Sequence, residues 1–285
     1  MIVVTGANGQ LGRQVVEHLL TRVPADQIGV SVRDPTQAQP LEQRGVRVRR
    51  GDFDDASSLS HAFEGASRVL VVSASALGET AIRLNATAIG AAKAAGARRI
   101  FYTSHVGASP DSPFPPMPTH AVTEAALREL DVPFTVLRNG FYAEFAPTLL
   151  GDALQTSELR GPEDGAISFT THADLAEATA VALTDDGLDD ETLALTAAEA
   201  VDLSDIAAIT SKLAGRPIRR VVVSDDEHRA SLVAQGLPAV RVNMAMGLFQ
   251  ASRLGQFARV DTTLARLVNR PPTPLEDVLR ASLPA

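Results

Sequence analysis

Short apolar runs alternate with segments of helical apolar spacing over the first half of the chain. Residues 2–4 form a β-branched run of the kind found in buried parallel strands. Behind them, Leu11, Val15 and Leu19 recur at helical spacing. We predict strands at 1–5, 28–32, 45–49, 68–73, 99–103 and 133–138, and helices at 10–21, 36–43, 57–64, 79–95 and 119–130. This alternation predicts an α/β fold, with a doubly wound parallel sheet covered by helices on both faces.

The pattern becomes looser after residue 140. Residues 151–165 are rich in glycine and acidic residues and are predicted to form a loop. We predict further strands at 166–170 and 218–223, helices at 173–184, 203–213, 225–235, 239–253 and 275–282, and an acidic turn at 185–190. The expected division is a sheet domain over 1–140 and a smaller, mostly helical lobe over 141–285, with 166–184 returning to the sheet domain. Ligands of open α/β sheets bind at the carboxyl ends of the strands, so we expect the lobe to close over a substrate there.

A glycine-rich turn follows the first strand directly and opens the first helix. Gly6 permits a tight turn, Gly9 lets backbone N–H groups approach phosphate oxygens, and Gly12 lets the helix pack close to the strand. The helix N-terminus then directs its partial positive charge at a diphosphate. An ordinary strand–turn–helix unit is the alternative, but the position of the turn favours a dinucleotide site. The expected contacts come from Gly6, Asn8, Gly9, Gln10, Leu11 and Gly12.

The second strand ends at Arg33, where a dinucleotide fold meets the adenosine ribose. A carboxylate at this place binds a ribose 2′-hydroxyl, whereas an arginine accommodates a 2′-phosphate. The neighbouring Asp34 precedes Pro35, an order typical of a helix N-cap followed by a proline in the first turn. We therefore predict that residues 1–140 form an NAD(P)-binding Rossmann-type domain and that the cofactor is NADPH (NADP⁺) rather than NADH.

The ends of the third and fourth strands carry further candidate cofactor contacts. Asp52 and Phe53 are expected to meet the edge and the face of the adenine. The acids of this stretch suit helix capping equally well, by Asp54 or Asp55. After the fourth strand, Ser73, Ala74 and Ser75 are small enough for backbone to lie against a cofactor.

The sixth strand ends in Asn139, Gly140, Phe141 and Tyr142, which suit a platform for the nicotinamide or a flat substrate. We expect one of the two aromatic residues to pack in the core beneath the lobe. Tyr142 is the candidate catalytic residue, in the role of positioning the substrate carbonyl through a hydrogen bond.

Composition narrows the classes of partner. The 26 basic and 34 acidic residues give a net charge of −8, which argues against nucleic acid or an anionic membrane as the main partner. There is no cysteine and the six histidines are scattered, so no metal site is predicted. No apolar run approaches the ~20 residues that span a bilayer, and a first strand beginning at Met1 leaves no room for a signal peptide. We expect a cytoplasmic protein with a small-molecule substrate, with monomer and homodimer both open.

Several of these segments together resemble the NmrA-like atypical short-chain dehydrogenases. Within that group the similarity is greatest to bacterial NAD(P)H:quinone oxidoreductases and triphenylmethane dye reductases. The resemblance implies NADPH on the glycine turn, with Arg33 at its 2′-phosphate. It also implies cofactor contacts from Ser73 to Ser75 and from the stretch between Asn139 and Glu144. Thr103, at the end of the fifth strand, is a further candidate contact. The segments that carry the resemblance are residues 5–12, 32–35, 51–53, 92–96, 102–104 and 137–142.

The chain lacks the catalytic pair of ordinary short-chain dehydrogenases, a Tyr-x-x-x-Lys motif in which the lysine lowers the pKa of the tyrosine. Its only tyrosines are Tyr102 and Tyr142, and Val106 and Ala146 stand four residues later. Relatives also carry a lysine in a Thr-Glu-Lys run where this chain has Ala125. Alcohol oxidation and sugar epimerisation by the usual mechanism are therefore excluded.

Two histidines are candidate proton donors. His120 and Glu124 are spaced i,i+4 on a predicted helix, but a surface His–Glu contact worth about 0.2–0.5 kcal/mol is the simpler interpretation. For His172, a helix cap by Thr171 or Asp174 explains the local sequence more simply.

A quinone needs no catalytic pair, because its ring accepts hydride directly and water protonates the weakly basic product. We therefore predict an NADPH-dependent reductase that transfers hydride, without a flavin, to quinones or similar flat, electron-poor compounds. The alternative is a non-catalytic NADP(H)-sensing regulator that acts through a protein partner.

Overall fold

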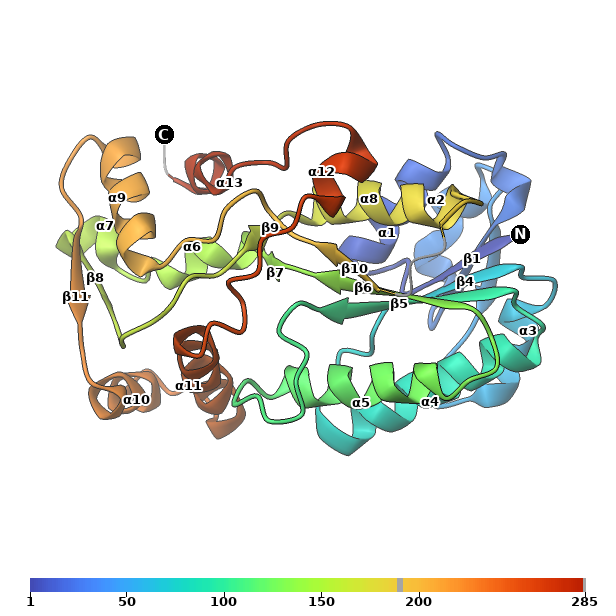
Figure 1. Ribbon diagram of the computed structural model, residues 1–285, viewed down its shortest axis with the longest axis horizontal. Coiled ribbons are helices and arrows are strands. Elements are labelled where there is room, and N and C mark those ends of the chain that lie inside the picture. Colours follow the sequence, from blue (N-terminus) through green and yellow to red (C-terminus); the bar gives the residue numbers. More distant parts are fainter. Residues whose placement is uncertain (189–191, 284–285) are drawn as a thin grey trace.

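The computed structural model describes residues 1–188 and 192–283. Its centre is a sheet of seven parallel strands in the order β3-β2-β1-β4-β5-β6-β10 (Figure 1). The chain adds β2 and β3 on one side of β1 and then crosses over to add β4 and the later strands on the other side. This doubly wound order confirms the predicted fold. The strands are β1 (Ile2–Thr5), β2 (Ile28–Val32), β3 (Arg47–Arg50), β4 (Arg68–Val71), β5 (Arg99–His105), β6 (Phe134–Asn139) and β10 (Thr192–Leu195).

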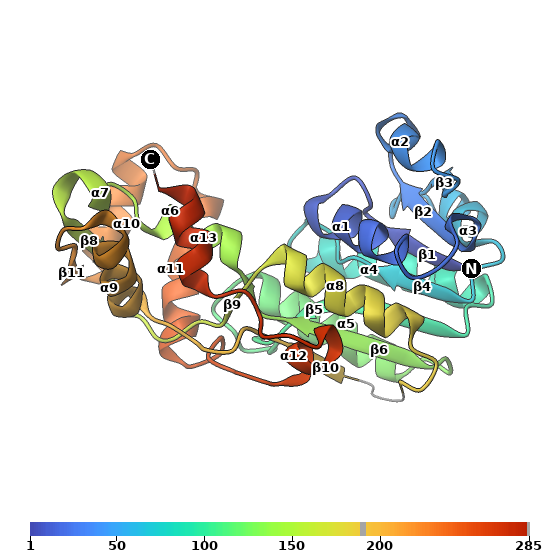
Figure 2. The ribbon, with the colours of Figure 1, turned by 90° about the horizontal axis from the view of Figure 1, so that it is seen from above.

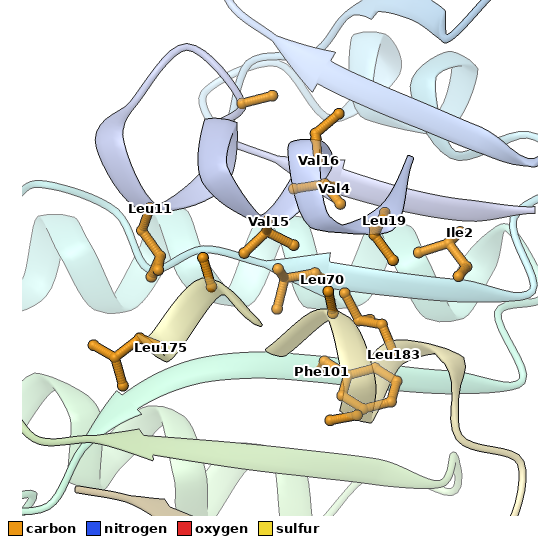
Figure 3. Close-up of a cluster of buried hydrophobic side chains, with 14 of the residues drawn as sticks. Ile2, Val4, Leu11, Val15, Val16, Leu19, Leu70, Phe101, Leu175 and Leu183 are labelled. Atoms are coloured by element: carbon orange, nitrogen blue, oxygen red, sulfur yellow. The ribbon is translucent and has the colours of Figure 1, made fainter. Parts of the chain in front are cut away.

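Helices cover both faces of the sheet because each central strand is apolar on both sides. In β1, Ile2 and Val4 point to one face and Val3 to the other. The close-up in Figure 3 shows Leu11, Val15 and Leu19 of the first helix packed over the strands on one face. That face carries α1 (Gln10–Leu19), α8 (His172–Thr184) and α12 (Thr263–Val268), and the other carries α3 (Ala56–Phe63), α4 (Gly78–Ala94) and α5 (Pro116–Arg128).

A smaller lobe stands beyond the carboxyl ends of the strands and has an apolar core of its own (Figure 2). It contains two short parallel pairs, β8 (Glu158–Gly161) with β11 (Arg219–Val222) and β7 (Phe141–Tyr142) with β9 (Phe169–Thr170). Its helices are α6 (Ala146–Leu149), α7 (Ala153–Thr156), α9 (Leu203–Ala214), α10 (Asp225–Ala234), α11 (Ala239–Arg253) and α13 (Leu275–Ser282). The short elements η1 (Ala25–Gln27), η2 (Pro35–Ala38), α2 (Gln39–Glu42) and η3 (Ala143–Phe145) complete the fold.

Sequence patterning was wrong in several places, each of which holds short elements. Residues 151–165 contain α7 and β8 instead of a single loop, and the helix predicted at 36–43 is a 3₁₀ turn followed by one α-turn. The edge strand β10 and the helix α12 were missed, and the strand predicted at 166–170 is reduced to β9. Two-residue strands and one-turn helices show no measurable periodicity, because they end before a pattern can repeat. The last two residues of the acidic turn predicted at 185–190 lie outside the described residues.

The chain passes back from the lobe to the sheet after β9. Helix α8 then lies beside α1 in one apolar core, and β10 adds to the edge of the sheet beside β6. The division at residue 140 stays a prediction, with β10 and α12 lying against the sheet as α8 does. Over the described ranges, 1–188 and 192–283, none of the helices has the length and apolarity needed to cross a bilayer.

Candidate active site

The glycine turn is folded tightly between β1 and α1. Gly6 has a φ of +65° and donates its N–H to the carbonyl of Ser31, and Gly9 donates to the carbonyl of Gly6 at 2.9 Å. The first helical hydrogen bond runs from Arg13 N to Gly9 O, so the N–H groups of residues 10–12 have no partner within the helix. Leu11 turns its side chain into the core and offers only backbone to a ligand. These free N–H groups at a helix N-terminus fit a diphosphate.

Gly12 is the position of this turn that is least tolerant of a side chain. A Cβ at Gly12 would lie 2.4 Å from the carbonyl oxygen of Gly6. We expect Gly12→Ala to lower the free energy of unfolding by about 1–3 kcal/mol and to weaken NADPH binding, because the helix must move away from the turn. Urea denaturation and a fluorescence titration with NADPH measure the two effects.

Gly90 in α4 is the matched control, since a Cβ there meets nothing within 4 Å. Gly90→Ala should stabilise the helix by about 0.5–1 kcal/mol and leave NADPH affinity unchanged. Equal stability of the two variants would contradict the assignment of Gly12.

Arg33 lies beside the glycine turn with its side chain exposed. It makes no hydrogen bond or ion pair with any described residue, so its guanidinium is available to a phosphate. The Asn8 side chain joins the two loops by donating to the Asp34 carbonyl at 3.0 Å. Asp34 is engaged elsewhere: its carboxylate accepts from the N–H of Thr36, which confirms the predicted N-cap. Hydrogen bonds from the Thr36 and Gln37 side chains and from the Thr36 N–H lower the pKa of Asp34.

The two candidate cofactor residues after β3, Asp52 and Phe53, have different surroundings. One carboxylate oxygen of Asp52 accepts from the N–H of Asp54 at 3.1 Å, and Phe53 packs partly buried against the apolar core on the α3 face. Asp55, not Asp54, caps α3 by accepting from the N–H of Ser58. The open alternative between the two acids is thereby decided.

Buried side chains accept hydrogen bonds from the backbone of the loop after β4, residues 73–75. Ser73 donates its N–H to Thr103 Oγ1, and Ala74 donates to Asn85 Oδ1, both at 2.9 Å. Thr103 is 1% exposed, so it supports this loop and presents almost no surface of its own. The loop itself lies at the carboxyl edge of the sheet, level with the glycine turn.

The interpretation of His120 and Glu124 as a surface pair was wrong. Glu124 is 1% exposed and accepts two hydrogen bonds from Arg138, at 2.9 and 2.6 Å, and one from the hydroxyl of Ser104 at 2.6 Å. Burial alone raises the pKa of Glu124, but the hydrogen bonds from Arg138 and Ser104 and the charges of Arg138 and Arg128 outweigh it, so the pKa is lowered. His120 faces away from this group and contacts Tyr102.

The two aromatic residues after β6 divide as expected. Phe141 packs edge-on or tilted against Phe114, Phe169 and Phe257 in the lobe core. Tyr142 is 38% exposed, and its ring lies over that of His172 with the centroids 4.1 Å apart.

The neighbours of the Tyr142 ring are His172, Glu144 and Asn139. Glu144 accepts from the N–H of His172 at 2.9 Å, and its other carboxylate oxygen lies 2.8 Å from His172 Nδ1. Thr171 caps α8, which decides the alternative between Thr171 and Asp174. The Asn139 amide is buried and approaches Tyr142 without a hydrogen bond of normal geometry. The Tyr142 ring is therefore held in place by its neighbours and remains partly exposed at the end of β6.

These features lie along one edge of the sheet, and comparison with known proteins assigns the chain to a family. The model of the NmrA-like family matches residues 1–265. The chain belongs to the NmrA-like family. Quinone oxidoreductase 2 of Escherichia coli (strain K12) is 34% identical over 278 residues, which cover 97% of this NmrA-like chain and 96% of that protein.

Solved structures of other proteins share the whole fold. The NADPH-dependent quinone oxidoreductase of Escherichia coli, complexed with NADPH, has a TM-score of 0.92 at 33% identity and covers 99% of each chain. The triphenylmethane reductase of Citrobacter sp., complexed with NADP(H), has a TM-score of 0.91 at 32% identity, covering 99% of this chain and 100% of that one. The resemblance to NmrA-like proteins that the motifs indicated is confirmed.

Several polar residues of this NmrA-like chain were missed as parts of the site. Asn85 carried a signal, because it occupies the buried stripe of α4 formed by alanines at 81, 88 and 92. Tyr102 and Arg138 lie in segments that carry the family resemblance, and His172 was a candidate proton donor, but their roles were missed because each depends on a residue of another element. The predicted contacts from the glycine turn, Arg33, the loop after β4 and the end of β6 do come together at one edge. Their roles toward a cofactor stay predictions.

Proposed function

We propose that the protein is an NADPH-dependent reductase that transfers a hydride directly to quinones or similar flat, electron-poor compounds without a flavin. The observation that carries the proposal is the fixed, partly exposed ring of Tyr142 just after β6, at the same carboxyl edge of the sheet as the open N–H groups of the glycine turn. A flat acceptor stacked there needs only orientation, because hydride transfer to a quinone is favoured by near-attack geometry. The quinone and dye reductases among its relatives support this choice of acceptor.

The residues present fit NADPH. The open N–H groups of Gln10, Leu11 and Gly12 would hold the diphosphate, in a turn shaped by Gly6 and Gly9, and Arg33 would hold the 2′-phosphate, since these groups are unpaired donors. The end of β3 and the loop after β4 would line the adenosine and ribose, and residues 139–142 with Glu144 would line the nicotinamide. When bound, NADPH supplies a hydride together with its electron pair.

Positioning is the remaining task of the protein. The Tyr142 ring packs against the ring of His172, and the backbone N–H of His172 donates a hydrogen bond to Glu144. The ring therefore keeps its orientation without a ligand, and an acceptor that stacks on it pays little ordering entropy. The acceptor takes up the hydride, and water supplies the proton that completes the hydroquinone.

A non-catalytic NADP(H) sensor is the competing function, and one assay separates the two. We expect the protein to oxidise NADPH in the presence of 1,4-benzoquinone, at a rate that saturates with quinone and is followed by loss of the absorbance of the reduced nicotinamide. A mixture without protein corrects for the direct reaction of quinone with NADPH. Tight NADPH binding without turnover of benzoquinone, a naphthoquinone or a triphenylmethane dye would refute the reductase and favour the sensor.

A further inference from the structure

His120 is anchored to the protein by one ring nitrogen and open at the other. It lies on α5 just inside the end that starts at the carboxyl edge of the sheet. Its Nδ1 is 3.0 Å from the hydroxyl of Tyr102, a fully buried residue of β5. Its Nε2 makes no hydrogen bond with any residue that the structure describes, and the surrounding atoms do not enclose it.

A chain of hydrogen bonds leads from the loop after β4 to His120 and favours a proton on its Nε2. The N–H of Ala74 can only donate, so the Asn85 oxygen that it contacts accepts, and the amide nitrogen of Asn85 must point the other way. That nitrogen donates to the Tyr102 hydroxyl at 3.2 Å. The Tyr102 hydroxyl, which already accepts from Asn85, can then give its own proton to His120 Nδ1 at 3.0 Å. A neutral imidazole whose Nδ1 accepts carries its hydrogen on Nε2, the open nitrogen.

The same chain of residues ties His120 to the loop expected to line the cofactor. Asn85 binds Ala74, and Thr103, the neighbour of Tyr102, binds Ser73. Tyr142 is close enough to raise the pKa of Tyr102 by its charge, after the larger effect of burial. The open nitrogen of His120 and the ring of Tyr142 thus belong to the same edge of the sheet.

We propose that His120 is a catalytic residue, whose Nε2–H donates a hydrogen bond to the carbonyl oxygen of the quinone, and that Tyr102 is the positioning residue that sets its tautomer. The inference rests on the proposed reductase function and specifies its acceptor: a compound with a carbonyl oxygen beside the reacting ring. The quinone receives a hydride, with both electrons, and becomes the hydroquinone anion. The anion then takes a proton from water, and His120 keeps its own proton throughout.

The charges around the imidazole agree with a neutral donor. Burial lowers the pKa of His120 to about 4, and the charge of Glu124 opposes this only in part. Burial also raises the pKa of Tyr102, which keeps the phenol protonated, and lowers the pKa of the facing His105 to about 3. A donor aimed at an oxygen that gains charge in the transition state accelerates a reaction without giving up its proton.

The tautomer is tested on the protein without cofactor. Nitrogen-15 NMR of the histidine side chains should show His120 as the neutral Nε2–H form from about pH 5.5 to about pH 8.5, a range that spans the ordinary histidine pKa. In Tyr102→Phe, which keeps the ring but removes the hydroxyl, the signals should move toward a mixture of tautomers. An Nδ1–H form in the unaltered protein would overturn the proposal.

Kinetics test the donor itself. His120→Phe should lower kcat with 1,4-benzoquinone about 100-fold and leave the NADPH dissociation constant unchanged, and His120→Gln, whose amide can donate, should recover part of the rate. Tyr102→Phe should lower kcat about 5-fold, the effect of one neutral hydrogen bond. His61→Gln, at an exposed histidine of α3, is the control and should match the unaltered protein.

The pH dependence separates a neutral donor from a proton-giving imidazolium. The ratio of kcat between the unaltered protein and His120→Gln should stay constant over the same pH range, whereas an imidazolium acid would lose its advantage above the ordinary pKa of about 6.5. An unchanged kcat in His120→Phe, or a loss explained by weaker NADPH binding, would overturn this inference alone. Absence of turnover in the unaltered protein with every quinone would overturn the reductase function and this inference with it.

Discussion

Replacement of Glu124 by alanine is expected to lower the free energy of unfolding by about 3–5 kcal/mol, the usual cost of removing one partner of a buried ion pair. Glu124 is enclosed between α5 and the sheet, where it accepts three hydrogen bonds from Arg138 and Ser104. Without it, the half-buried guanidinium of Arg138 loses its partner inside the protein. Urea denaturation followed by circular dichroism measures the change.

Two further variants make the result specific to the buried charge. Glu129→Ala, at an exposed glutamate just beyond the same helix, should change stability by no more than about 0.5 kcal/mol. Glu124→Gln keeps the shape and removes the charge. Because the pKa of Glu124 is lowered in the folded protein, the advantage of the native residue over glutamine is present above the unfolded pKa of about 4.3 and is lost as the pH falls through the folded pKa. An equal loss at Glu129, or an advantage that does not change in acid, would contradict the prediction.

Arg33→Ala is expected to weaken NADPH binding by about 10- to 100-fold, since a hydrogen bond to a charged group contributes about 1.5–3 kcal/mol and 1.4 kcal/mol corresponds to a factor of ten. NADH has no 2′-phosphate, so its affinity should stay the same. The exposed side chain of Arg33 has no described partner to release, and the substitution should leave stability unchanged. Fluorescence titrations with both cofactors give the dissociation constants.

The control for Arg33 is Arg22, another exposed arginine. Arg22 follows α1 at its far end, away from the glycine turn, and Arg22→Ala should affect neither cofactor. Raising the salt concentration should weaken NADPH binding to the unaltered protein and have less effect on Arg33→Ala, because a phosphate contact is screened by ions. Equal losses of NADPH and NADH affinity in Arg33→Ala would show that Arg33 has another role.

The sequence by itself determined six of the seven strands of the sheet and the glycine turn, and it predicted the class of cofactor. Strand β1 shows as a continuous β-branched run, and helix α1 is long enough for its apolar period to show, which also predicts its buried face. Gly6 and Arg33 follow strand ends and Gly12 lies in the first turn of α1, positions at which the role of a residue depends on local backbone and side-chain chemistry. The caps by Asp34 and Thr171 were predictable for the same reason, because a cap and its N–H partner are two or three residues apart.

Only the tertiary structure decided the partners of the buried polar residues. The i,i+4 spacing of His120 and Glu124 suggested that they contact each other, but the rotation of α5 against the sheet turns Glu124 to Arg138 of β6 and His120 to Tyr102 of β5. Tyr142 likewise takes its orientation from His172, on a helix that follows a loop and two short strands. Spacing along a chain reports neighbours on one element, whereas a buried polar group takes its partner from whichever element the packing brings to it.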